Sequence, residues 1–186
     1  FIIILSLFLT TNVFADKCYN QESLPLILNS DKKPGRFFED QPDVNDDYQV
    51  HIIYSLLKDS KDKEGDINDA IEKWIEASDK YFLKTTKKAN EKSNFKDGKA
   101  QNIKWDRRKN GKLDISFIRI NKTKKELKKS KSGSCGNVFG RTIVNAGFNN
   151  PKKIYFNFGD FSFSEWPYSG GFPIFSVFAK HQNSYN

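Results

Sequence analysis

Residues 48–57, YQVHIIYSLL, constrain the fold most, because they are apolar almost without a break. β-branched and aromatic residues dominate this stretch, and such residues favour strands. A strand with one face in water alternates apolar and polar residues, and this one does not. We therefore predict a central strand that is buried on both faces.

The chain after this strand has the pattern of an amphipathic helix. Asp66 is the expected N-cap, because its carboxylate can accept hydrogen bonds from the free N–H groups of a first turn. We expect the helix to end near Thr86. Apolar and small residues recur every three or four positions and form its inner face: Ile67, Ile71, Trp74, Ile75, Ser78 and Phe82.

Further strands are predicted at residues 113–120, 154–158 and 174–179, with short ones at 24–28 and 103–106. Residues 107–111 form a hairpin turn in which Asn110 and Gly111 take the positive-φ positions. Residues 121–134 form a short surface helix, and 138–146 form either a helix or a strand. This order predicts an α/β (α+β) fold, a mixed sheet with one long amphipathic helix on a face. We expect its core to contain Val50, Ile52, Ile71, Trp74, Ile115 and Phe117.

The first residues have the pattern of a signal peptide. Residues 1–9 are apolar, and the small residue Ala15 precedes the charged Asp16, so we predict cleavage between these two. The apolar run has about half of the ~20 residues that a membrane-spanning helix needs. We therefore predict a secreted or periplasmic protein without a stable membrane anchor after cleavage. Because no Met and no basic residue precede the run, we expect the gene product to start upstream of Phe1.

The remaining chain divides into an extended leader at residues 16–47 and a single domain at 48–186, which we expect to be incomplete on its C-terminal side. Two cysteines occur, Cys18 and Cys135. In an exported chain they form one disulfide, pair with a cysteine beyond Asn186, or stay as free thiols. The net charge of +8 comes mainly from Lys, in a composition typical of AT-rich coding, so we predict no nucleic-acid partner.

The residues themselves indicate no active site. His51 lies inside the predicted central strand and is expected to be a hydrogen-bonded strand histidine, while His181 lacks a partner at helical spacing. Lys61 and Lys63 stand where a calcium loop at residues 59–66 would need oxygen ligands. The four acidic residues of that loop lie too close together to form an acid–base pair, so the loop is interpreted as a solvated turn: Asp59, Asp62, Glu64 and Asp66. We name no catalytic, cofactor-binding or metal-ligating residue.

A resemblance adds to this interpretation. YQVHIIY at 48–54, the loop at 59–67, the helix with Trp74 and GKLDISF at 111–117 resemble the front half of secreted bacterial zinc metallopeptidases of the metzincin-like type. In that family the fold begins with a strand, a long helix and further strands, and the zinc-binding HExxH helix follows. The resemblance spans residues 48–155 and implies a truncated metallopeptidase-like upper subdomain that lacks HExxH.

For the full-length protein, the resemblance implies zinc and a peptide or protein substrate. Histidine-bound zinc would activate a water, and a glutamate would take its proton. The alternative is a non-enzymatic periplasmic or extracellular binding protein with an aromatic C-terminal surface, or a plain secreted structural domain. That surface would consist of Trp166, Tyr168, Phe172 and Phe175. If the C-terminal half of the domain is missing, an apolar face of the sheet is left uncovered. We therefore expect the chain to be only marginally stable.

Overall fold

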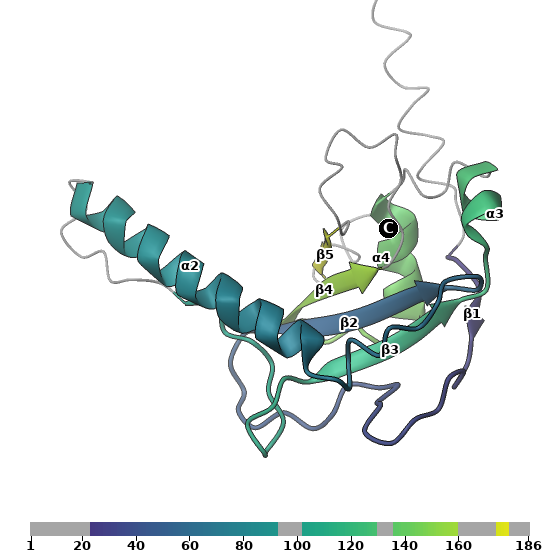
Figure 1. Ribbon diagram of the computed structural model, residues 1–186, viewed down its shortest axis with the longest axis horizontal. Coiled ribbons are helices and arrows are strands. Elements are labelled where there is room, and N and C mark those ends of the chain that lie inside the picture. The colour runs from purple at the N-terminus through teal and green to yellow at the C-terminus, as the bar shows by residue number, and fades with distance from the viewer. Residues whose placement is uncertain (1–22, 93–101, 130–135, 160–173, 179–186) are drawn as a thin grey trace, which may run out of the picture.

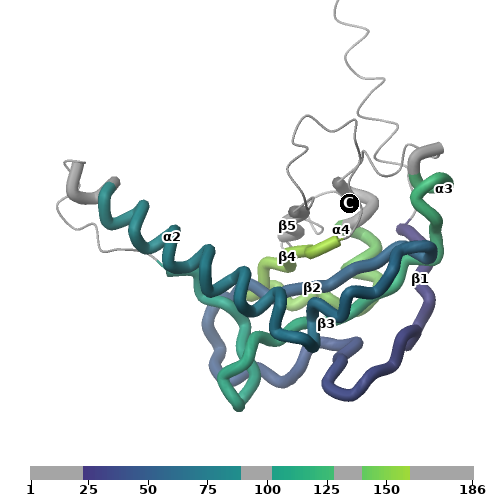
Figure 2. The backbone as a smooth tube through the Cα atoms, in the orientation of Figure 1, coloured from purple at the N-terminus to yellow at the C-terminus, as the bar shows by residue number. Residues whose placement is uncertain are grey.

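The computed structural model describes residues 23–92, 102–129, 136–159 and 174–178, the coloured part of Figure 2. At 174–178 and at some helix ends it describes the backbone alone. Several sequence predictions lie outside the described residues: cleavage between Ala15 and Asp16, the pairing of Cys18 and Cys135, and the positions of Trp166, Tyr168, Phe172 and His181. The side chain of Phe175 is likewise not described.

The fold is of the α+β class, as predicted, with one mixed five-stranded sheet in the order β1-β3-β2-β4-β5. The central strand β2 pairs in parallel with β3 and with β4, whereas β1 and β5 pair antiparallel at the two edges. Every residue of β2 except Val50 is buried, which confirms the predicted two-sided burial. The bounds are β1 (Leu26–Ile27), β2 (Gln49–Leu57), β3 (Ile115–Ile120), β4 (Lys153–Gly159) and β5 (Ile174–Phe178).

Helices cover both faces of this sheet (Figure 1). Helix α2 (Ala70–Lys92) connects β2 to β3, and its Ile71 and Ile75 join the core cluster on one face. Helix α4 (Gly136–Asn145) connects β3 to β4, and its Ile143 joins the cluster on the other face. The short helix α3 (Lys124–Lys129) lies in the predicted surface-helix region. The ambiguous stretch at 138–146 is thus helical.

The start and the apolar face of α2 differ from the prediction. Asn68, not Asp66, accepts the N–H of Ala70 at 3.0 Å, because the Asp66 carboxylate is bound by Arg36. Trp74 and Phe82 are 47% and 40% exposed, so they are not core residues. Trp74 lies between the buried Ile71 and Ile75 and packs edge to face on Phe158, with the rest of its side chain in solvent. Phe82 belongs to the later part of α2, which extends beyond the sheet (Figures 1 and 2).

The predicted hairpin forms, with Arg107 and Leu113 paired antiparallel across it. Gly111 takes a φ of 81°, but Asn110 does not share the positive φ. Instead, the Asn110 side chain accepts the N–H of Lys112 at 3.1 Å. The short strand expected at 103–106 is reduced to an isolated bridge between Trp105 and Val50.

Residues 23–47, predicted as an extended leader, pack on the domain from Ser23 onward. They supply strand β1, a parallel bridge from Phe37 to Ser116, and the buried Arg36. Within the described residues, no helix has the length and apolar character needed to cross a membrane.

Candidate functional site

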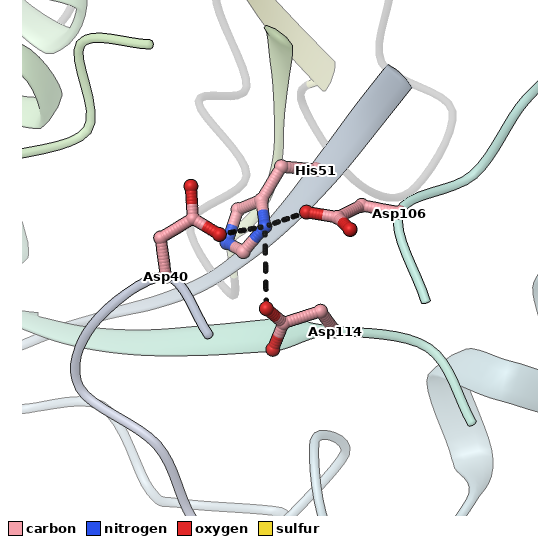
Figure 3. A group of neighbouring side chains, drawn as sticks. All are labelled: Asp40, His51, Asp106 and Asp114. Atoms are coloured by element: carbon pink, nitrogen blue, oxygen red, sulfur yellow. Dashed lines mark hydrogen bonds and ion pairs between the residues drawn. The ribbon is translucent and has the colours of Figure 1, made fainter. Parts of the chain in front are cut away.

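A group of five mostly buried polar side chains lies where the parallel strands begin, and Figure 3 shows four of them. His51 lies near the start of β2, and Asp114 directly precedes β3. Asp106 lies at the base of the hairpin, and Asp40 belongs to the segment before β2. Lys153 is the first residue of β4. We call these five residues the polar centre.

His51 is fully buried and hydrogen-bonded through both ring nitrogens. Its Nδ1 lies 2.9 Å from Asp106 Oδ2, and its Nε2 lies 3.0 Å from Ser116 Oγ. The same Nδ1 is 3.5 Å from Asp40 and 3.9 Å from Asp114. The ring stacks on Phe148 with centroids 5.8 Å apart. The expectation of a hydrogen-bonded strand histidine is therefore confirmed.

Lys153 supplies the positive charge of the polar centre. Its ammonium, 1% exposed, lies 2.6 Å from Asp40, 2.5 Å from Asp43 and 2.7 Å from Asp106. Burial alone would lower the pKa of Lys153, but hydrogen bonds to these carboxylates outweigh it and raise the pKa above its ordinary value. All three donors of the ammonium are therefore used, and the group stays charged.

The two deepest carboxylates are compensated unequally. Burial opposes the charge of Asp106, but hydrogen bonds with His51 and Lys153 prevail and lower its pKa. At Asp114 burial dominates and raises the pKa. Asp114 Oδ2 accepts the backbone N–H of Gln41 at 2.8 Å, whereas its Oδ1 is buried without any hydrogen-bond partner. Asp114 is therefore the under-compensated member of the polar centre.

Backbone hydrogen bonds of the hairpin position the carboxylates of Asp106 and Asp114 beside His51. The N–H of Asp114 donates to the carbonyl of Asp106 at 2.9 Å and closes the hairpin. The N–H of Asp106 donates to the carbonyl of Val50 at 2.9 Å, which fixes the hairpin beside β2. The turn at Gly111 thus determines where Asp106 and Asp114 lie.

Hydrogen bonds connect Asp106, His51 and Ser116 in the order of the acid, base and nucleophile of a hydrolase triad. This order raises the question of whether Ser116 acts as a nucleophile. A serine nucleophile must be reached by a substrate carbonyl. Ser116 and His51 are 0% exposed, and Ser116 lies within strand β3. A buried strand hydroxyl cannot attack a bound substrate, so the chain of hydrogen bonds orients the imidazole instead.

Tyr155 forms part of the wall around His51, with ring centroids 5.6 Å apart. Its hydroxyl accepts the backbone N–H of Asn150 at 2.9 Å. Burial raises the pKa of Tyr155 to about 12, so the phenol stays neutral. The polar centre thus lies against an uncharged aromatic wall.

A cavity of about 430 Å³ borders the polar centre at the edge of the sheet. Phe38, Phe117, Ile118 and Phe148 form apolar parts of its wall, and Asp40 contributes a carboxylate. The Asp40 side chain is 22% exposed, whereas those of His51, Asp106 and Asp114 are at most 1% exposed. Asp40 is therefore the side of the polar centre that a small solute can approach.

The acidic loop after β2 forms a second charged cluster, around Arg36. The Arg36 guanidinium contacts Asp62 at 2.8 Å and Asp66 at 2.7 Å, and it lies 4.1 Å above the ring of Phe117. The interpretation of this loop as a solvated turn is wrong for Asp62 and Asp66, whose side chains are 9% and 1% exposed. Their partner lies about 30 residues away in the sequence, and no local pattern indicates it.

Sequence reasoning named no ligand or catalytic residue, and it missed most of the polar centre. One available signal was the spacing of Asp106, Asn110, Gly111 and Asp114, which matches the first, fifth, sixth and ninth positions of a calcium loop. Arg108 stands at the third position, where the calcium pattern has Asp or Asn. Asp40 and Lys153 carry no comparable signal.

Comparisons with known proteins assign nothing further: no protein family, no curated protein and no solved structure matches this chain.

Proposed function

We propose that this chain is the front, non-catalytic part of an exported zinc-metallopeptidase-like domain, whose catalytic zinc site lies outside these 186 residues. The observation that carries the proposal is the order of the elements. A buried strand, a 23-residue helix on one face, and further parallel strands follow one another, as the resemblance implies for the front of that family. The antiparallel β5 completes the sheet at one edge.

The contribution of this part is a scaffold. The buried face of α2 holds the helix on the sheet through Ile71 and Ile75. The polar centre joins the amino ends of β2, β3 and β4, with Lys153 as its member from β4. The described residues offer no histidine that a substrate can reach, because His51 is fully buried. In the proposed protein, the zinc-bound water and its glutamate base therefore come from the HExxH helix.

The decisive experiment uses the full-length gene product. We expect bound zinc and hydrolysis of a protein substrate such as casein, both lost after treatment with a chelator and regained on adding zinc. A coding sequence that stops at Asn186, or a longer product without HExxH and without proteolysis, would reject the peptidase.

Export is tested separately. We expect the mature protein outside the cytoplasm, with Asp16 as its first residue by N-terminal sequencing. Recovery of the untrimmed chain from the cytosol would contradict this part of the proposal.

The alternative, a non-enzymatic binding protein, has support from a different observation. Trp74, Tyr81 and Phe82 are 47%, 72% and 40% exposed on α2, part of which extends past the sheet. Exposed large aromatic side chains on one helix are a feature of interaction surfaces. A zinc-free full-length product that binds a polysaccharide or protein would favour this alternative, provided that the double variant Trp74→Ala/Tyr81→Ala loses the binding.

A further inference from the structure

We propose that the polar centre binds one divalent transition-metal ion through Asp40, His51, Asp106 and Asp114. Each residue offers one ligand atom, and these four atoms lie within 4.8 Å of one another. Four tetrahedral ligand atoms of an ion bound at about 2.0–2.2 Å lie about 3.4 Å apart. The most widely separated of the four atoms must therefore approach each other by about an ångström to close around an ion.

The surroundings of His51 suit a metal ligand. A ligating histidine usually donates its second ring N–H to a fixed partner, which sets the tautomer. In the ion-free chain Nδ1–H donates to the Asp106 carboxylate. With an ion bound, His51 takes the other tautomer: Nε2–H donates to Ser116 Oγ, 3.0 Å away, and the lone pair of Nδ1 points to the ion. Phe148 stacks on the ring and holds its plane.

Asp114 gives a second, independent indication of a missing partner. Its Oδ2 faces His51 Nδ1 at 3.9 Å in Figure 3, and its other oxygen, Oδ1, is buried without any hydrogen-bond partner in a residue that is 1% exposed. Asp40, Asp43 and Asp106 share the single ammonium of Lys153, so the carboxylates outnumber the cation. Buried charge of one sign is costly without a counter-ion, and a divalent cation supplies one.

The donor set selects the class of ion. Calcium and magnesium prefer oxygen ligands throughout, whereas an imidazole favours zinc, iron or related first-row ions. One imidazole with three carboxylates therefore fits Zn²⁺, or Mn²⁺ and Co²⁺ in its place. Four protein ligands in a buried position are typical of a structural site, so the ion would fasten the hairpin and the segment before β2 to the sheet.

The ammonium of Lys153 competes with the ion for two of its carboxylate ligands. This ammonium donates to Asp40 and Asp106, two of the four ligands, at 2.6 and 2.7 Å. Asp43, 2.5 Å away, is not a ligand and can retain the ammonium when the ion enters. The ion enters from the cavity that Asp40 borders. Removing the ammonium should therefore strengthen binding.

The test uses the 186-residue chain, in which HExxH is absent, so its outcome is separate from that of the peptidase proposal. After chelation and dialysis, Co²⁺ is added and its visible absorption is recorded, with Zn²⁺ and Mn²⁺ binding measured by equilibrium dialysis. We expect one ion per chain and a higher unfolding midpoint. His51→Gln should abolish the Co²⁺ band, and Lys153→Met should lower the dissociation constant tenfold or more.

Asp69→Asn is the matched control, because Asp69 is an exposed carboxylate outside the polar centre, and it should bind as the parent chain does. Lys153→Met also keeps the test decisive if His51→Gln does not fold. Absence of Co²⁺ binding in both the parent chain and Lys153→Met overturns the proposal. An unchanged Co²⁺ band in a folded His51→Gln chain also overturns it.

Discussion

The polar centre and the Arg36 cluster both bury a cation among carboxylates, but they satisfy their charges to different degrees. Arg36 uses all five of its N–H donors, on Asp62, Asp66 and the carbonyl of Asp31. Every carboxylate oxygen of Asp62 and Asp66 receives a hydrogen bond. In the polar centre Lys153 is saturated as well, yet Asp114 keeps one oxygen without a partner.

The difference follows from the geometry of the two cations. A guanidinium presents a planar fork that matches two carboxylates at once, whereas an ammonium is a point charge with three donors. The Arg36 cluster is therefore closed to further partners, and its members should be sensitive to every change. In the polar centre one carboxylate oxygen receives no hydrogen bond, so this cluster should tolerate the loss of one carboxylate.

The largest effect is expected at Arg36. Arg36→Met leaves two buried carboxylates without their partner, which typically costs about 3–5 kcal/mol of stability. Urea denaturation of the parent and variant chains measures the difference. Arg36→Lys should recover only part of it, because lysine cannot form the forked contact. Full recovery by lysine would show that charge alone, without geometry, holds this cluster.

The second effect contrasts Asp66 with Asp114 in the metal-free chain. Asp66→Asn removes a carboxylate held by two N–H donors of Arg36 and should destabilise by about 2–3 kcal/mol. Asp114→Asn replaces an under-compensated anion by a neutral amide and should change the unfolding free energy by less than about 1 kcal/mol. Equal losses in both variants would remove the distinction between the two clusters.

A smaller effect is expected at the glycines that shape the two clusters. Gly35 and Gly111 have φ of 82° and 81°, which L side chains rarely adopt, and neither has a close neighbour that an added Cβ would strike. Gly35→Ala and Gly111→Ala should each destabilise by about 1 kcal/mol through backbone strain. Because Gly111 positions Asp106 and Asp114, only Gly111→Ala should also weaken Co²⁺ binding.

The effect expected at Asp62 depends on pH, because its contribution to stability is fully present near neutral pH and fades in acid. Burial opposes its charge, but the guanidinium of Arg36, the N–H of Glu64 and Lys33 prevail and hold its pKa well below the usual range. Its stabilisation is complete above the ordinary aspartate pKa and is lost as the pH falls toward the folded-state pKa. Asp62→Asn should flatten the slope of unfolding free energy against pH between about 4 and 2. An unchanged slope would contradict this assignment.

Local sequence was sufficient wherever neighbouring residues decide the structure. The unbroken apolar run at 48–57 has no polar face to present to water, so the central place of β2 followed from it. Asn110 and Gly111 indicated the hairpin because few residues other than glycine adopt its positive φ. The periodic Ile71 and Ile75 identified the buried face of α2, but not the point at which the helix leaves the sheet.

Only the tertiary structure brought together the residues that carry the chemistry. Lys153 and Asp40 are 113 positions apart, and Asp106 lies 55 positions after His51. They meet because parallel pairing aligns the beginnings of β2, β3 and β4 and turns their polar side chains to the same face. A local pattern records which residues prefer a strand or a turn. Strand order and register, which depend on packing of the whole chain, decide which charges meet.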